Sequence, residues 1–191
     1  MKTFFITLLV TLITASQLFC QVTKTNEPNW IDAINYQEFE INTDEIIEGT
    51  VVLLYDNQIH VPKQESFTRL TTKITDNVGV QNASNITIAY DPTYQTLNLH
   101  KVNIIRDGKV LNKLDVNDFQ VMRRELNAEN FLYDGSLSAV MNISDVRTGD
   151  IIDYSYSIKG FNPIHNNTFS TSFYLNDYES IGLVHDKNTT H

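Results

Sequence analysis

The chain has 191 residues, a formal net charge of −9, seven glycines and four prolines. An acidic surface repels phosphate backbones, so nucleic acid is not expected as a partner, and the scarcity of Gly and Pro argues against a disordered linker. The stretch 22–191 has the length of one domain and contains no internal repeat, so a single domain is predicted there.

Residues 1–21 have the order of a secretory signal peptide. Lys2 precedes an apolar run at 4–13, and small and polar residues follow at 15–17. The run is shorter than the ~20 residues of a membrane-spanning helix, although a short retained anchor is the alternative. We therefore expect cleavage near residue 20 or 21 and no membrane span afterwards. The exported chain would then reside in the periplasm, on the outer surface or outside the cell, with a net charge of −9 − 1 = −10 once Lys2 is removed.

Cys20 is the only cysteine. Phe19 precedes it, and Gln17 stands where a lipoprotein signal usually has Leu, so plain export is favoured over lipidation. Cleavage after Cys20 leaves no thiol, which excludes a disulfide framework, a Cys nucleophile and a Cys-based zinc site.

The strand signals begin at Thr50–Tyr55, which is apolar on both faces after Thr50 and suits a central strand. Further along, the alternation slips by one residue, and a bulge near His100-Lys101 corrects it. Asp107-Gly108 then suits the positive φ angles of a tight hairpin turn. The bulge would place four apolar residues on one face: Leu97, Leu99, Val102 and Ile104.

Three later segments alternate with period two, namely 136–143, 151–158 and 168–175. Asp134-Gly135 opens the first, and Thr148-Gly149-Asp150 turns the chain into the second. The side chains predicted to point inward are Leu137, Ala139, Met141, Ile143, Ile152, Tyr154, Tyr156, Ile158, Phe169, Thr171, Phe173 and Leu175. Asp153, Ser155 and Ser157 are predicted to face solvent.

Helix signals are weak. Asn29–Tyr36 is expected to make a turn or two, and Asp115–Asp118 a single turn. Many short strands with frequent turns predict an all-β fold, either an antiparallel β-sandwich or a partly closed barrel, with little helix.

Motifs for chemistry are absent from the sequence. None of the five histidines has metal spacing, and there is no Gly-x-Ser-x-Gly and no Gly-rich phosphate loop. Carboxylate pairs such as Asp44-Glu45 or Asp150 and Asp153 are interpreted as solvated surface. We therefore predict no catalytic residue, no metal and no cofactor. Five Asn-x-Ser/Thr triplets are attributed to chance in an Asn- and Thr-rich chain.

An aromatic cluster has two interpretations. It could line a groove for carbohydrate or peptide, or it could pack in the core, which is favoured because Tyr154 and Tyr156 share a face with Ile152 and Ile158. The cluster comprises Tyr154, Tyr156, Tyr174, Tyr178 and Phe161.

The segment from Asp145 to Pro163, DVRTGDIIDYSYSIKGFNP, resembles a known family. It is similar to the domain of unknown function in front of transglutaminase-like cores in large exported bacterial proteins, mostly from Gram-negative species. The likeness extends from Trp30 to Leu175. Four other blocks agree in the same order: 51–56, 104–109, 123–125 and 132–135.

This resemblance implies a structural motif and no chemistry of its own. Family members usually continue into a papain-like Cys-His-Asp core, which this sequence lacks, so no catalytic residue is carried over. Asp145, Arg147, Gly149 and Asp150 would set a turn, with Gly149 at positive φ and Arg147 available to an acidic partner. The motif residues are Arg106, Asp107, Gly108, Asp134, Gly135, Asp145, Arg147, Gly149, Asp150, Tyr154, Tyr156, Gly160, Asn162 and Pro163.

The resemblance also implies one or two strands after Leu175, whereas the sequence ends in a polar stretch, 186–191, interpreted as the tail of a chain truncated after about 175–191. The apolar residues from Phe173 to Val184 would form a last strand or expose an interface.

The leading hypothesis is a non-catalytic exported module that packs against, or presents substrate to, a transglutaminase-like core. The alternatives are a free-standing glycan- or peptide-binding domain of the periplasm or cell surface, and a hydrolase that uses carboxylates.

Overall fold

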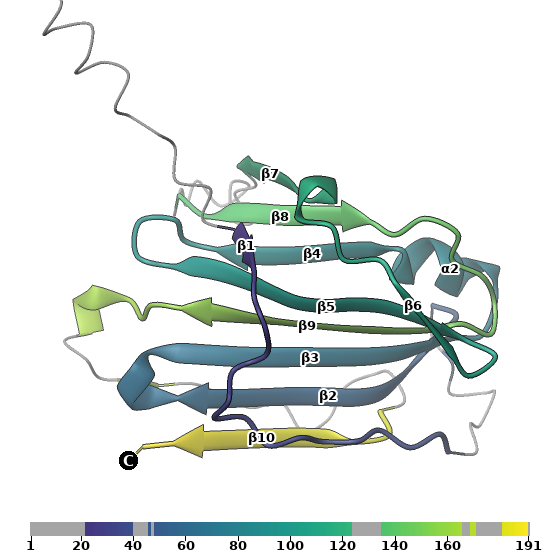
Figure 1. Ribbon diagram of the computed structural model, residues 1–191, viewed down its shortest axis with the longest axis horizontal. Helices are drawn as coiled ribbons and strands as arrows, with labels where there is room; N and C mark the ends of the chain where they lie inside the picture. The colour runs from purple at the N-terminus through teal and green to yellow at the C-terminus, as the bar shows by residue number, and fades with distance from the viewer. Residues whose placement is uncertain are drawn as a thin grey trace, which may run out of the picture.

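The computed structural model describes residues 22–39, 46, 48–123, 135–165, 169–170 and 181–190. These described residues are mostly β-strand, arranged as two sheets that do not close into a barrel, which confirms the predicted sandwich and not the barrel (Figure 1). The predicted strand at 168–175 lies almost entirely outside the described residues, and so does the predicted leader at 1–21.

The larger sheet has the strand order β1-β5-β9-β3-β2-β10, with β6 paired to the far end of β5. Its inner pairs are antiparallel, but the two outermost strands, β1 and β10, run parallel to their neighbours β5 and β2. The antiparallel arrangement predicted from the sequence thus holds for the inner pairs, and the two edge strands add parallel pairing to it. The strands are β1 Val22–Lys24, β2 Thr50–His60, β3 Glu65–Ile74, β5 Thr96–Arg106, β6 Lys109–Asn112, β9 Ile151–Lys159 and β10 Val184–Thr189.

Strand β10 corrects the interpretation of residues 186–191 as a tail. Val184–Thr189 pairs with Tyr55–His60, and the ladder continues upstream through a bridge between Ile181 and Val52. Polar residues form this strand because hydrogen bonds to β2 satisfy the backbone of an edge strand whatever its side chains are. The apolar residues just before the tail thus lead into a last strand, although Leu183 stays 40% exposed.

The smaller sheet contains three strands in the order β4-β8-β7: β4 Asn85–Tyr90, β8 Leu137–Asn142 and β7 Gln120–Arg123. The core between the sheets takes apolar side chains from both. The predicted inward residues of β8 and β9 belong to this core, with Tyr154 and Tyr156 partly buried against it. The largest contributions come from Ile86, Ile88, Leu97, Leu99, Ile104, Met141 and Ile152.

Two local predictions on β5 are confirmed. The register between β5 and β9 shifts between Leu99 and Lys101, so a bulge returns the following apolar residues to the core. Asp107 and Gly108 both have positive φ, 49° and 74°, and close the hairpin in which Arg106 pairs with Lys109.

The helical elements differ from the prediction. The single turn after Asp115 is confirmed as η3, Val116–Asp118, with the Asp115 side chain accepting from the amide of Asn117 at 2.9 Å. Of the turns expected at Asn29–Tyr36, one is present at Asn29-Trp30 and a bend follows at Ile31, after which residues 32–39 have no regular secondary structure. Three further elements were not predicted: α2 Asn77–Ala83, η2 Val61–Lys63 and η5 Pro163–His165.

Residues 25–39 cover the outer face of the larger sheet. In Figure 1 this segment leaves β1 and crosses β5, β9, β3 and β2 before it continues along β10. The face beneath it is polar and yet buried, since Asp153, Ser155 and Ser157 are at most 4% exposed. The prediction that these three residues face solvent is therefore wrong. Strand periodicity gives the side to which a residue points but not what covers that side.

Candidate functional site

The family-like motif folds into a turn clamped by a distant arginine. Arg106, at the end of β5, donates from Nε and Nη2 to the two carboxylate oxygens of Asp150, both at 2.8 Å. Its Nη1 and Nη2 also reach the side chain and carbonyl of Asp145, at 3.1 and 2.6 Å. Two sequence blocks that lie far apart thus meet, because β5 and β9 are antiparallel neighbours and the end of β5 lies beside the start of β9.

Arg147 completes this turn from within. Its guanidinium donates to Asp145 Oδ1 at 2.8 and 3.0 Å, and its amide donates to Asp150 Oδ2 at 2.8 Å. The acidic partner expected for Arg147 is therefore Asp145, two residues upstream. Hydrogen bonds from Arg106 lower the pKa of Asp150, and hydrogen bonds from Arg147 and Arg106 lower that of Asp145. Both carboxylates are held ionised as acceptors, which fits a structural role and not proton transfer.

Gly149 has the positive φ predicted for it, +90°, and its amide donates to the carbonyl of Ile74 at 2.9 Å. A Cβ on Gly149 would meet no atom within 4 Å, so the backbone angle alone favours glycine here. The carbonyl of Asp150 in turn accepts from the amide of Ile74 at 2.9 Å. These bonds fasten the turn to the end of β3.

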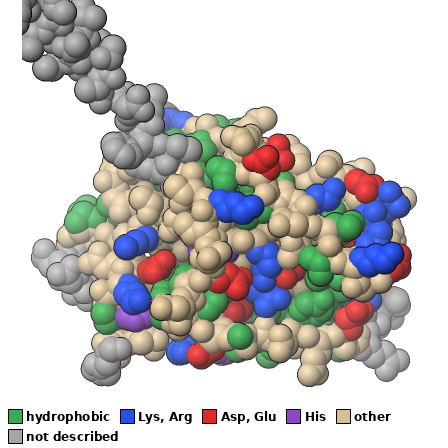
Figure 2. All heavy atoms as spheres, viewed as in Figure 1, with side chains coloured by type: hydrophobic (Ala, Val, Ile, Leu, Met, Phe, Trp, Pro, Cys, Tyr) green, Lys and Arg blue, Asp and Glu red, His purple; other side chains and the backbone are tan. Residues whose placement is uncertain are grey.

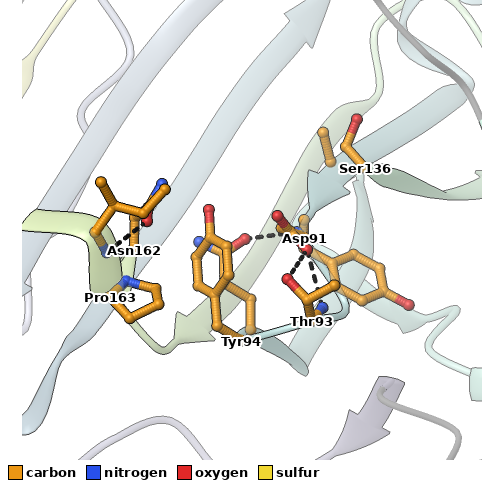
Figure 3. Close-up of a pocket in the computed structure, with 10 residues that line it drawn as sticks. Asp91, Thr93, Tyr94, Ser136, Asn162 and Pro163 are labelled. Atoms are coloured by element: carbon orange, nitrogen blue, oxygen red, sulfur yellow. Dashed lines mark hydrogen bonds between the residues drawn. The ribbon is translucent and has the colours of Figure 1, made fainter. Parts of the chain in front are cut away.

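The opposite end of the sandwich holds a hollow of about 560 Å³, which we call the end pocket. The loop between β4 and β5, the start of β8 and the segment after β9 form its walls (Figure 3). Figure 3 shows Tyr94 between Asn162 and Pro163 on one side and Asp91 and Thr93 on the other. The lining residues are Ala89, Tyr90, Asp91, Thr93, Tyr94, Gln95, Ser136, Asn162, Pro163 and Ile164.

Much of the polar lining holds the pocket in shape. Asp91 Oδ1 accepts from the amide and hydroxyl of Thr93 at 2.9 and 2.6 Å, and Asn162 Oδ1 accepts from the amide of Ile164 at 3.0 Å. Gly160 has φ +116°, and a Cβ there would lie 1.9 Å from the carbonyl oxygen of Tyr94. Glycine is therefore required at 160 for the chain to pass the Tyr94 loop.

The motif residues consequently fall into three groups. One group forms the clamped turn and the adjoining hairpin, and Tyr154 and Tyr156 pack in the core. The third group, with Gly160, Asn162 and Pro163, lies at or beside the end pocket. Gly135, with φ +75°, adjoins the pocket residue Ser136, whereas Asp134 lies outside the described residues.

The sequence analysis missed the loop that supplies most of the pocket, Asp91–Gln95. A signal was present, since Asp-Pro followed by Thr between two alternating runs is typical of a turn. Of the aromatic cluster, Tyr154 and Tyr156 stack in the core with ring centroids 6.3 Å apart, as favoured. Phe161 stacks on Phe169 at 4.5 Å. Tyr174 and Tyr178 lie outside the described residues.

A charged layer on the outer face was also missed. Arg69 Nε and Nη2 donate to the two oxygens of Asp153 at 2.7 and 3.1 Å, and Lys101 Nζ lies 3.3 Å from Asp153 Oδ2. Nearby, His185 Nδ1 lies 2.8 Å from Oδ1 of the buried Asp56. Figure 2 shows acidic and basic side chains interspersed on this side of the molecule. The ion pairs of this layer and the contact between His185 and Asp56 join neighbouring strands.

Within the described ranges, no three His, Cys, Asp or Glu side chains are grouped so that they could hold a metal ion. None of the helices described there is long and apolar enough to cross a membrane.

The two-sheet sandwich with its clamped turn belongs to a known domain family. A family model described as a Domain of Unknown Function with solved-structure (DUF3857) matches residues 62–188, more than half of the chain, and the chain belongs to this family. No curated protein matches the chain.

One similar solved structure is the crystal structure of a putative protease from Parabacteroides distasonis ATCC 8503. The TM-score is 0.51 at 19% sequence identity, and the match covers 59% of this chain and 23% of that chain. At this identity the likeness shows the fold alone. The chain thus spans less than a quarter of the protein it resembles.

Proposed function

We propose that this chain is a non-catalytic module of an exported protein, and that it packs against, or presents substrate to, a transglutaminase-like catalytic core. Family membership and the motif from Asp145 to Pro163 support this proposal. A further support is the fold shared with part of a much longer protein described as a putative protease, in which the similar region is 23% of the chain.

The observation that carries the proposal is the use of the charged groups. The buried carboxylates of Asp150 and Asp153 are each held by an arginine of the same sheet, so they join strands and turns. Among the residues that line the end pocket, Asp91 is the single carboxylate. Glycoside hydrolysis, as one example of carboxylate chemistry, needs two carboxyl groups that face each other across a cleft. This geometry favours packing or binding over hydrolysis.

The experiment has two parts. The genomic locus is sequenced across the codon for His191, where we expect a reading frame that encodes a Cys-His-Asp core. The isolated chain and the encoded parent are then assayed with labelled casein and a glutamine donor, and only the parent is expected to turn them over. Turnover by the isolated chain that survives repurification, or a locus without a core, would refute the proposal.

A matched pair of variants in the parent tests the end pocket. Tyr94→Ala removes a pocket wall and is expected to lower kcat/KM if the module presents substrate. Arg147→Ala changes an exposed side chain at the opposite end of the sandwich and is expected to leave turnover unchanged. Equal activity of both variants would restrict the module to packing.

A second candidate function is glycan binding in the end pocket, favoured by the tyrosine ring of Tyr94 beside the polar side chains of Asp91 and Asn162. A flat aromatic ring next to hydrogen-bonding groups is a common feature of small-ligand sites. Calorimetric titration of the isolated chain with oligosaccharides tests this candidate. Binding that Tyr94→Ala abolishes would support it, and no heat with any oligosaccharide would count against it.

A further inference from the structure

The segment 25–39 is held to the larger sheet in the way a protein holds an extended peptide. It crosses the strands instead of joining the ladder (Figure 1). Among the described residues, its backbone hydrogen bonds to the sheet are limited to one, from the amide of Thr25 to the carbonyl of Leu99 at 3.0 Å. Side chains of the sheet provide the remaining polar contacts.

Three of these side chains contact the main chain of the segment. The Gln58 amide accepts from the N–H of Asp32 at 2.8 Å and donates to the carbonyl of the same residue at 2.9 Å. Arg69 Nη1 donates to the carbonyl of Ile34 at 2.8 Å, and His100 Nδ1 lies 3.2 Å from the carbonyl of Thr25. Every non-proline residue has these backbone groups, so this mode of contact is independent of the sequence of the segment.

Several side chains of the segment bind the sheet. Glu27 accepts from the Ser155 hydroxyl at 2.7 Å and lies 3.3 Å from Lys101 Nζ, and Glu38 pairs with Lys73. Trp30 donates from Nε1 to Glu65 Oε2 at 3.0 Å, and its ring meets that of His60 edge-on with centroids 5.4 Å apart. The Asp32 carboxylate accepts from Lys187 Nζ at 2.7 Å. The pattern selected by the sheet is an aromatic residue followed, after one residue, by an acidic residue.

A pocket of about 190 Å³, partly open to solvent, lies between the segment and the sheet, bordered by Ile31 and Ile34 on one side and by Phe67 and Arg69 on the other. Larger side chains than those of this segment would find room here.

The charged groups under the segment keep partners without it. Asp153 is bound by Arg69, Lys101 and the hydroxyl of Thr71, all from the sheet. Departure of the segment would leave Asp153 paired but would uncover Phe67 and the apolar cluster of Val51, Leu53 and Ile151, on which Tyr36 packs. A peptide with the sequence of the segment restores this cover when it replaces the segment.

We propose that the outer face of the larger sheet, formed around Gln58, Glu65 and Arg69, is a binding site for extended peptides of the pattern aromatic–x–acidic. Residues 25–39 occupy this site in the chain itself and can be replaced by a peptide supplied in trans. The site is distinct from the end pocket and requires no catalytic core, so it goes beyond the proposed function.

The test uses the full mature chain and a fluorescent synthetic peptide of residues 22–39. Trp30→Ala weakens the internal segment while every binding residue on the sheet remains. We expect the peptide to bind this variant at least about tenfold more tightly than the wild type, in which the tethered segment competes at high effective concentration. A peptide that carries the same Trp30→Ala change should bind neither protein.

Gln58→Met, added to Trp30→Ala, is the variant of the site itself, because it keeps the side-chain length and removes the contact with the peptide unit of Asp32, together with the hydrogen bonds from Gln58 to Asp56. The affinity for the peptide should fall about tenfold or more, as expected when two hydrogen bonds between uncharged groups are lost.

Circular dichroism and thermal melts verify that each variant is folded. If Trp30→Ala is unfolded, it is replaced by Trp30→Phe, which keeps an aromatic ring and loses the hydrogen bond to Glu65. Folded variants that bind no peptide, or that bind it equally with and without Gln58, would overturn the proposal.

Discussion

The guanidinium of Arg106 and the carboxylate of Asp150 form two parallel hydrogen bonds of 2.8 Å between the end of β5 and the residue that precedes β9. The Asp150 side chain is only 2% exposed, whereas one-fifth of the Arg106 side chain reaches solvent. This pair fixes the turn 145–150 relative to the sheet. Several consequences can be measured.

Arg106→Lys is expected to destabilise the domain. A lysine ammonium is a point charge and cannot reproduce the paired bonds of the guanidinium, so the buried Asp150 carboxylate loses a hydrogen-bond donor. Urea denaturation followed by circular dichroism should show a lower midpoint. The matched control is Arg147→Lys, whose side chain is 62% exposed and should shift stability by less than about 0.5 kcal/mol. Equal midpoints for the two variants would contradict the clamp.

Gly149→Val should cost about 1–3 kcal/mol, because a β-branched residue is strained at positive φ. No atom lies within 4 Å of the added Cβ, so a clash cannot account for the loss. Gly149→Asn is the control and should cost less, since Asn tolerates the left-handed region better than Val. The measurement is the free energy of unfolding, and an unchanged value for Val would show an ordinary backbone conformation at 149.

Stability should fall in acid through Asp145 and Asp150. Hydrogen bonds from Arg147 and Arg106 lower the pKa of these groups in the folded state. Their contribution is therefore complete above the unfolded value, about 3.9, and is lost as the pH falls through the folded pKa. Thermal melts between pH 6 and pH 2 should show this loss, and Asp150→Asn should flatten the curve. A wild-type curve parallel to that of the variant would exclude the effect.

His100 should add a second acid dependence, at higher pH. Burial lowers its pKa in the folded state, so below the unfolded value of about 6.5 the unfolded chain binds a proton that the folded chain resists. Stability is thus expected to decrease as the pH falls below about 6.5. His100→Gln keeps hydrogen-bonding capacity without titration and should remove this step. Melts at pH 7.5 and pH 5.5 that shift equally in both proteins would argue against it.

The edge of β10 should promote self-association. Among the strands of the described residues, β10 is the last in the order of the larger sheet, and the exposed Leu183 precedes it. An open strand edge beside an apolar side chain favours pairing with another chain. Sedimentation should show an average mass that rises with concentration, and Leu183→Glu should restore the monomer with stability changed by less than about 0.5 kcal/mol. A monomeric wild type, with an unfolded Leu183→Glu, would show that Leu183 belongs to the core.

Much of the fold could be predicted because β8 and β9 alternate strictly and are buried on the core side. The bulge at His100 and the turn at Asp107-Gly108 have local causes, an alternation slip and a positive-φ pair. The short helix α2 has no such purely local cause. Its N-cap residue, Asp76, is local, but Gly79 packs against the carbonyl of Gly49, where a Cβ on Gly79 would lie 1.8 Å from the oxygen. Contacts between distant segments leave no periodicity in the sequence.

Contacts between distant segments also limit how much of the site could be predicted from the sequence. The motif from Asp145 to Pro163 was recognised as a block, but the strand β9 within it places its two ends at opposite ends of the sandwich. Asp150 finds its partner, Arg106, only through the register of β5 and β9. The end pocket likewise depends on the pairing of β4 with β8, which brings Ser136 near Tyr90.

The parallel edge strands bear on the order of folding. β1 joins β5, and β10 joins β2 through contacts such as that between His185 and Asp56, which are 129 residues apart in the sequence. Contacts so distant along the chain carry a large loop-closure entropy, and sheets rich in them form in about milliseconds to seconds. Until residues 184–189 have been synthesised, β2 lacks its outer neighbour. The sheet is therefore completed only after these residues have been made, and until then a nascent chain carries an open strand edge at β2.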